Sequence, residues 1–257
     1  MPPEGIDLTG ANLSSADLQG AFLERALLNS AILSRADLSS ANLSGAHLTA
    51  ALMSEANLFG ADATAAKFAD AKLQSAVLSW AHASGAHFEY ADLTGADLTS
   101  AVLSHASFSR ARLRGSYLGS ANLVEASFEG ADLQGADLRA ALIRKTNFRK
   151  ANLTASNLSA TKIDGASLAH ATLKQADLSH SRLYDSDLAD ADLRGAILVG
   201  SVLGRSNLVG ARWDNGTDWG STDILELMLM RSKRLQDGSY VILGAENPVN
   251  TRVLVSQ

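Results

Sequence analysis

A large apolar side chain recurs at every fifth residue through most of this chain. Stepping by five from Leu8 to Trp213 meets 42 positions, and 40 of them hold Leu, Met, Ile, Phe or Trp. Two places before these, from Ala11 to Ala211, 33 positions hold Ala and the other eight hold Ser or Thr. The three remaining positions of each unit are mostly polar. Each five-residue unit therefore has two inward and three outward residues.

A period of five residues fits neither a regular α-helix nor a flat β-strand. Five residues turn an α-helix by about 500°, so the apolar positions would drift around its whole surface. On a strand the side chains alternate with a period of two, so an odd repeat sends successive leucines to opposite faces. The pattern fits a chain that bends at each unit and points every large side chain to one axis. We therefore expect an all-β solenoid.

The exceptions to the leucine pattern give the number of sides. Phenylalanine takes the central position at intervals of 20 residues, at Phe68, Phe88, Phe108, Phe128 and Phe148. The two small exceptions, Ala63 and Ala83, each lie one unit before a phenylalanine, as expected if the ring occupies space that a neighbour gives up. Four units of five residues then make one square coil. With coils about 4.8 Å apart, about ten of them form a rod on the order of 50 Å long.

The units ADLTG, ANLVE and ADLQG resemble the A(D/N)LXX units of pentapeptide-repeat proteins, over residues 6–213. The resemblance implies a right-handed quadrilateral parallel β-helix. It brings no catalytic residue with it. The family includes inhibitors and protectors of DNA gyrase that imitate duplex DNA, together with many proteins of unknown role, so the resemblance leaves the function open.

The pattern divides the chain into a lead-in over residues 1–5, the β-helix over 6–215 and a C-terminal cap over 216–257. Asp223 and Glu226 form a D-x-x-E capping signal, which predicts an α-helix over about 224–236 with basic residues at its end. The segments SYVIL and TRVLV predict a short hairpin over about 239–255. We expect Trp219 to lie over the open end of the last coil, because unpaired strand edges need a cover.

Nothing in the sequence points to catalysis. The chain has no cysteine, and its six histidines all stand at outward positions without the spacing of metal ligands. A filled core leaves no pocket for a triad, so we predict no catalytic, cofactor-binding or metal site and no small-molecule substrate. The N-terminus lacks a signal-peptide pattern, and the apolar run ILELMLM is too short to cross a bilayer. We therefore expect a cytoplasmic protein without a transmembrane segment.

Charge is distributed unevenly along the chain. Residues 1–109 carry 11 acids and 4 bases, residues 110–150 carry 4 acids and 8 bases, and residues 151–257 carry 12 acids and 10 bases. One outward column contains Asp17, Asp37, Asp97, Asp137 and Asp177. A basic group follows, with Arg110, Arg112 and Arg114 just before Arg139, Arg144, Lys145, Arg149 and Lys150. The candidate partner-binding residues are Asp17, Asp37 and Asp97 together with these last five bases.

Apolar residues at outward positions are a second indication of a binding role. They are Phe22, Leu27, Ile32, Leu52, Phe59, Val77, Trp80, Tyr90, Tyr117, Leu142, Ile197, Val199 and Val202. We expect Leu27, Ile32 and Leu52 to form one patch, and Ile197, Val199, Val202 and Val209 a second patch beside the C-terminal helix. The expected helix is apolar on more than one face, which favours homodimerisation through Ile224, Leu225, Leu227, Met228, Leu229 and Met230. The alternative is a thicker monomeric cap, in which the hairpin from Ser239 to Val255 covers the second helix face.

Three function classes stay open at this point, and an enzyme is the least favoured of them; binding to a membrane surface or to nucleic acid through the basic residues is a further alternative. The first is a non-catalytic protein-binding rod or scaffold, whose partner the sequence does not name. The second is a DNA-mimicking topoisomerase inhibitor or protector that gives resistance to a drug or toxin. Duplex DNA carries one charge per about 1.7 Å, so a 50 Å mimic would show about 30 negative charges. The column offers five aspartates, which favours the first function.

Overall fold

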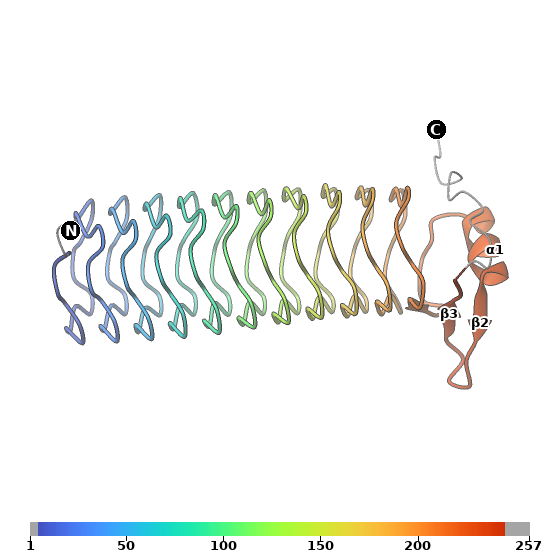
Figure 1. Ribbon diagram of the computed structural model, residues 1–257, viewed down its shortest axis with the longest axis horizontal. Coiled ribbons are helices and arrows are strands. Elements are labelled where there is room, and N and C mark those ends of the chain that lie inside the picture. Colours follow the sequence, from blue (N-terminus) through green and yellow to red (C-terminus); the bar gives the residue numbers. More distant parts are fainter. Residues whose placement is uncertain (1–4, 245–257) are drawn as a thin grey trace.

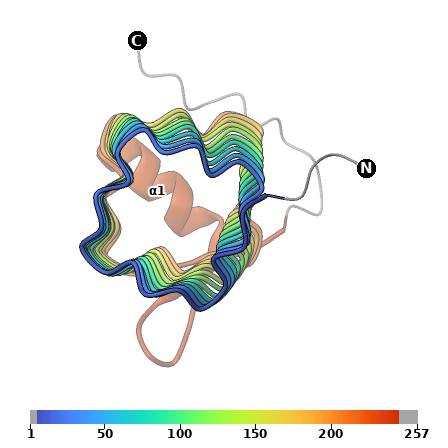
Figure 2. The same cartoon turned by 90° about the vertical axis from the view of Figure 1, so that its left-hand side faces the viewer.

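A computed structural model of the protein describes residues 5–244, and these form one rod with a different fold at its C-terminal end (Figure 1). Parallel bridges join the second residue of each unit, which points outward, to the residue 20 positions later, from the pair Asp7–Leu27 to the pair Asp192–Arg212. Seen along the rod, successive coils superimpose and enclose a four-sided outline (Figure 2). The chain is a repeat β-helix.

The four sides of the rod are named here by the first bridged residue on each. They are the Asp7 side, the Asn12 side, the Asp17 side and the Phe22 side. Along one side, residues 20 apart in sequence are neighbours in successive coils, about 4.8 Å apart. Consecutive units of the sequence lie on successive sides, so residues five apart face different directions.

Nearly every corner of the described coils is a β-turn. In the first unit the Ala11 N–H donates to the Leu8 carbonyl at 3.0 Å, and Gly10 between them has a positive φ of 67°. Many other residues take this conformation at the same position of later units, including Trp80 with a φ of 60°. The Trp80 N–H donates to the Thr99 carbonyl of the next coil at 3.0 Å. The ladder between coils thus holds non-glycine residues in a backbone region that they seldom adopt.

The axis of the rod is filled with apolar side chains. The five central phenylalanines are fully buried and stack face to face, with ring centroids 4.7 to 5.0 Å apart. Ala63 and Ala83 are fully buried as well, one unit before the first two rings. The prediction that every fifth residue points inward is confirmed by this burial.

The inward serines and threonines are all hydrogen-bonded. Each hydroxyl at the small inward position donates to a backbone carbonyl: Ser116, Thr146, Ser156, Thr161, Ser181, Ser186, Ser201 and Ser206. A buried hydroxyl without a partner would cost about 1 to 3 kcal/mol. These bonds explain why the eight exceptions to alanine are tolerated.

The C-terminal end contains strand β1 (Arg212–Trp213), helix α1 (Thr222–Met230), strand β2 (Ser232–Arg234) and strand β3 (Tyr240–Ile242). The strands form an antiparallel sheet in the order β1-β3-β2. In the view along the rod, α1 lies behind the four-sided outline of the coils (Figure 2). Met228 of α1 is buried and Ile224 packs against the core.

Helix α1 differs from the predicted helix over 224–236 at both ends. It begins earlier, because the Ser221 hydroxyl is the N-cap and accepts the Ile224 N–H. It ends at Met230, because Lys233 pairs with Val241 in the sheet. The expected basic last turn is therefore wrong: Arg231 is the C-cap and the next bases lie in or beside β2.

The expected hairpin over 239–255 falls partly outside the described residues, because TRVLV lies beyond residue 244. The first of its two predicted strands contains β3, which pairs instead with β2 and β1. The prediction missed β2 because the apolar helical pattern of ILELMLM was extended through the basic residues that follow it.

The coil continues past residue 215, where the sequence pattern places its end. Ile197 pairs with Asp218, 21 positions later, so one additional residue is accommodated before the last side. The Thr217 hydroxyl donates to the Leu193 carbonyl at 2.9 Å, as the inward hydroxyls of other units do. The segment TDWGS is thus one more unit, shifted by one residue, with Trp219 in the central position.

Three aromatic rings meet at the end of the core. Trp213 is fully buried, stacks on Tyr240 with ring centroids 4.4 Å apart, and meets the edge of Trp219 at 5.8 Å. The Trp213 Nε1 donates to the Ser232 hydroxyl at 2.9 Å. The last coil, the sheet and the segment before α1 therefore share one apolar cluster.

Candidate functional site

The aspartates and asparagines at the second position of the units have a structural role. In every such residue of the described chain, Oδ1 accepts the backbone N–H two residues later, as Asp37 does from Ser39 at 2.9 Å and Asn57 from Phe59 at 3.1 Å. A side chain that bonds its own backbone in this way stabilises a turn. The A(D/N)L pattern therefore serves the fold, and each aspartate also contributes a negative charge to the surface.

The predicted acidic column lies on the Asp17 side, as the spacing of 20 requires. Asp17 and Asp37 are bridged neighbours, whereas Asn57 and Val77 separate Asp37 from Asp97. Farther along, the Arg139 guanidinium binds the Asp137 carboxylate, with Nη2 and Oδ2 2.7 Å apart. This hydrogen bond, with the added attraction of the positive charge, lowers the pKa of Asp137 despite its partial burial. The column is thus interrupted, and one of its charges is neutralised.

We call the hydrogen bond from a backbone N–H to Oδ1 of the Asp or Asn two residues earlier the turn bond. At Asp37 the contribution of the turn bond and that of the negative charge can be tested separately. Hydrogen bonds from the side chain and backbone of Ser39 lower the pKa of the Asp37 carboxyl below its ordinary value. A lowered native pKa gives stability that is present above the pKa of the unfolded chain and is lost as the pH falls through the native pKa. Asn keeps the Oδ1 acceptor and does not titrate.

We therefore expect the unfolding free energy of the wild type, relative to Asp37→Asn, to fall as the pH drops below about 4. Urea unfolding of both proteins at pH 7 and pH 3 measures this difference. A difference that stays constant between the two pH values would contradict the assigned hydrogen bonds.

The five candidate bases are spread over three sides of the rod. Arg139 is on the Asp17 side, Arg144 and Lys145 are on the Phe22 side and its corner, and Arg149 and Lys150 are on the Asp7 side and its corner. Arg139 binds Asp137, and the Lys145 Nζ lies 3.5 Å from Glu125 Oε1. These five bases lie along one coil of the rod but face three directions, so they do not form a single patch.

The predicted apolar patches are only partly assembled. Leu27 lies on the Asp7 side, and Ile32 and Leu52 are bridged neighbours on the adjacent Asn12 side. The second patch is divided among three sides, with Ile197 and Val199 on the Asp17 side, Val202 on the Phe22 side and Val209 on the Asp7 side. These residues do not form the single surface that their closeness in sequence suggested.

Helix α1 leaves part of its apolar surface in water. Among the candidate dimer residues Met228 is buried, Ile224 and Leu227 are half-buried, and Leu225, Leu229 and Met230 are exposed. Met230 is the most exposed of them, with 79% of its surface accessible. One face of α1 therefore packs on the rod and another is free among the described residues.

Sequence reasoning treated the remaining outward aromatic residues as isolated. The structure places Phe59, Trp80 and Tyr117 on one side, the Asp17 side, within four successive coils. Grouping the units whose first residues are a multiple of 20 apart would have found them. The three aromatic residues belong to the units that begin at Ala56, Ala76 and Ser116.

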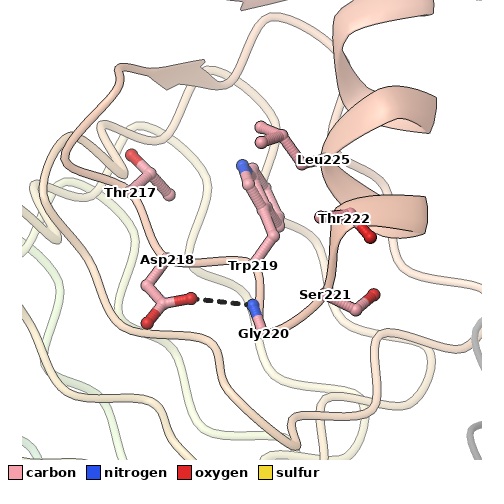
Figure 3. A pocket seen from close by; sticks show the side chains of 7 residues that line it. All are labelled: Thr217, Asp218, Trp219, Gly220, Ser221, Thr222 and Leu225. Carbon is pink, nitrogen blue, oxygen red and sulfur yellow. Dashed lines mark hydrogen bonds between the residues drawn. The ribbon is translucent and has the colours of Figure 1, made fainter.

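Two shallow hollows lie near the C-terminal end. One, of about 270 Å³, is lined by Thr217, Asp218, Trp219, Gly220, Ser221, Thr222 and Leu225 (Figure 3). The Asp218 carboxylate there accepts the Gly220 N–H at 2.9 Å, so it serves the turn in the same way as the aspartates of the coils. The other hollow, of about 320 Å³, includes Arg194, whose guanidinium is held by Asp192.

Within residues 5–244, no three histidine or acidic side chains are grouped so that they could hold a metal ion. No helix in the same range has both the length and the apolar character needed to span a membrane.

Comparison with known proteins gives a consistent family signal. The profile described as Pentapeptide repeats matches residues 6–45, 41–79, 76–115, 121–159, 151–188 and 186–212. Among curated proteins, none matches the chain.

Three solved structures illustrate the similarity. HetL, a pentapeptide repeat protein involved in heterocyst differentiation regulation in the cyanobacterium Nostoc sp. strain PCC 7120, is 32% identical; the match covers 84% of this chain and 92% of HetL, with a TM-score of 0.34. QnrB1, a plasmid-mediated fluoroquinolone resistance protein, is 22% identical over 70% of this chain and 90% of its own, with a TM-score of 0.45. A pentapeptide repeat protein of the Arabidopsis thaliana thylakoid lumen is 25% identical over 54% of this chain and 83% of its own, with a TM-score of 0.34.

Proposed function

Because this chain belongs to the pentapeptide-repeat family, we propose that it is a non-catalytic rod that binds another protein through its outward side chains. The observation that carries the proposal is the exposure of large aromatic residues that the fold does not use. Trp80 and Tyr117 expose 60% and 54% of their surface, although the core is already filled by other residues. Repeat proteins bind partners with extended surfaces of this kind. A cytoplasmic location stays a prediction.

The proposal is tested with a photo-cross-linking amino acid placed on each side of the rod in turn. Lys67, Lys72, Val77 and His82 are second-position residues of four consecutive units, one on each side, and none makes the turn bond of an aspartate or asparagine. In cells that naturally express the protein, we expect one position to give a discrete protein adduct. A second set, Val102, Ser107, Arg112 and Tyr117, repeats the test farther along. No adduct from any of the eight positions would contradict a protein-binding role.

The second candidate function is a topoisomerase-directed DNA mimic that inhibits or protects gyrase. The observation that favours it is the acidic start of the Asp17 side, where Asp17 and Asp37 are direct neighbours. A gyrase supercoiling assay, with and without the protein, tests it. An effect that disappears in Asp17→Lys/Asp37→Lys and weakens at high salt would support mimicry. No effect of the wild type at any concentration would eliminate it.

We also propose that the chain forms a homodimer through α1. The exposed Leu225, Leu229 and Met230 form an apolar surface that a two-fold partner would cover. Light scattering of the full chain at micromolar concentration is expected to give the mass of a dimer, and Leu229→Glu/Met230→Glu is expected to give a monomer. Phe22→Ser, at the other end of the rod, is the control and should leave the dimer intact. A monomeric wild type would contradict this proposal.

A further inference from the structure

The strongest unexplained surface is a group of apolar side chains in the middle of the Asp17 side. Bridges place Asn57, Val77, Asp97 and Tyr117 in four successive coils of this side. Phe59 belongs to the first of these units and Trp80 to the second. We call Phe59, Val77, Trp80 and Tyr117 the aromatic face. With coils about 4.8 Å apart, it extends about 14 Å along the rod.

The fold does not require these residues. In the column of Phe59, the neighbouring coils have Ser39 and Ser79, and in the column of Trp80 they have Gly60 and Ser100. Phe59 exposes 49% of its surface and Trp80 exposes 60%. Ser39 and Ser79 are only 7% and 9% exposed, and Phe59 and Trp80 are the large side chains beside them. Column spacing places Phe59 next to both serines, and Trp80 follows Ser79 in the chain, so two half-exposed rings stand in adjacent coils of this side.

The charge around the aromatic face has one sign. From residue 16 to residue 120, the units of the Asp17 side contain three acids, Asp17, Asp37 and Asp97, and no lysine or arginine. Each other side has at least one base in the same stretch, namely Lys67, Lys72 and Arg25. Asp37 lies one coil before Phe59, and Asp97 lies between Val77 and Tyr117.

The two nearest aspartates keep one carboxylate oxygen for a ligand. Oδ1 of Asp37 and of Asp97 accepts the N–H of Ser39 and Thr99, both at 2.9 Å. Oδ2 of each has no hydrogen-bond partner among residues 5–244. Because the hydrogen bond to Oδ1 fixes the orientation of the carboxylate, Oδ2 can accept a hydrogen bond from a lysine or arginine with little further loss of side-chain entropy.

We propose that the aromatic face binds a basic segment of a partner protein, in which arginine or lysine alternates with apolar residues. This inference rests on the proposed function and specifies its surface and the chemistry of its partner. Trp80 and Phe59 would contact the apolar side chains and the flat guanidinium groups, and Asp37 and Asp97 would pair with the charges. Nucleic acid and anionic membranes are disfavoured, because their phosphates would be repelled by the same carboxylates.

Trp80 provides a direct signal for binding. The chain has three tryptophans, and Trp213 and Trp219 are 0% and 3% exposed. Acrylamide therefore quenches mainly Trp80. The probe is an array of synthetic peptides that combine arginine or lysine with leucine or phenylalanine at every spacing up to one helical turn. Matched peptides replace the bases by glutamate or the apolar residues by serine. We expect some of the basic-apolar peptides, and neither matched set, to protect Trp80 from quenching.

Each substitution in the two double variants introduces a residue type that already occurs at the equivalent position of another coil, so it is compatible with the fold. Phe59→Ser/Trp80→Ser is expected to weaken binding of a labelled peptide about tenfold or more, as removal of interface aromatics commonly does. Asp37→Asn/Asp97→Asn keeps both turn bonds and is expected to weaken binding and reduce its salt dependence. The controls are Phe22→Ser, an aromatic residue on another side, and Asp62→Asn, which makes the same turn bond on the Phe22 side. Both controls should bind like the wild type.

Two results would overturn the inference: no array peptide binds, or the face variants and the controls bind equally well. Protection by the glutamate peptides, by single-stranded DNA or by anionic vesicles, with none by the basic peptides, would also overturn it. The cross-linking positions separate this failure from failure of the proposed function. An adduct at Lys67, Lys72 or His82 but not at Val77 keeps the protein-binding role and rejects the aromatic face. Absence of adducts at all positions rejects both.

Discussion

Replacing Phe108 by alanine is expected to lower the unfolding free energy by about 3 to 5 kcal/mol. Phe108 is fully buried, and its ring stacks between Phe88 and Phe128 with centroids 4.7 Å away on both sides. The loss combines the burial of the ring with the cavity that alanine would leave, and coils on both sides hold the walls of that cavity apart. Urea unfolding followed by circular dichroism measures the change.

The matched control for Phe108 is leucine, which takes the same column at Leu28, Leu48 and Leu168. Phe108→Leu keeps an apolar side chain in the core and is expected to cost about 1 kcal/mol. An outward control is Trp80→Ser, which should change the stability by less than about 0.5 kcal/mol. Equal midpoints for Phe108→Ala and Trp80→Ser would mean that the phenylalanine column does not support the rod.

Replacing Trp213 by alanine is expected to cost a similar amount, about 3 to 5 kcal/mol, at the C-terminal end. The change removes the stack on Tyr240, the edge contact with Trp219 and the hydrogen bond to Ser232. We expect the emission of Trp219 to shift to longer wavelength as its surroundings become wet. The Ile242 amide, which donates to Ala211, should exchange with solvent faster.

Trp213→Phe keeps an aromatic ring and loses the indole N–H, so it separates packing from hydrogen bonding. We expect it to retain most of the stability and to leave the Trp219 emission near that of the wild type. If Trp213→Ala unfolded like the wild type and Trp219 stayed shielded, the sheet and α1 would not depend on this cluster. The result would then conflict with the shared core.

The β-helix was predictable because nearly every five-residue unit from residue 6 to residue 213 has to bury one large apolar side chain at the axis. A period of five excludes the regular elements, and the spacing of Phe68 to Phe88 gives the length of a coil. The C-terminal end was less predictable because no pattern repeats there. The end of α1 depends on the pairing of Lys233 with Val241, a contact between distant residues that local preferences do not contain. The unit TDWGS was missed because one additional residue shifts it out of phase.

The candidate surface shows the same difference between local and distant information. Basic residues five apart, such as Arg144 and Arg149, look clustered in sequence but lie on different sides. Phe59 and Trp80 lie 21 positions apart in the chain, yet they belong to adjacent coils of one side and to neighbouring columns of it. In a four-sided coil the surface is predicted by comparing residues 20 apart. The identity of the partner depends on a second molecule. Neither the five-residue period nor the 20-residue period contains that information.

The turn bond at the second position of each unit has a consequence for how this surface can change over evolutionary time. Oδ1 is present in both aspartate and asparagine, and the backbone makes the same bond with Asp37 and Asn57. A single exchange between the two residues therefore alters the charge of one site while the shape of the rod is conserved. The sequence can drift between a neutral and a strongly acidic exterior in single steps that folding hardly resists. Selection on binding, acting through charge alone, is then free to give rods of one architecture very different partners.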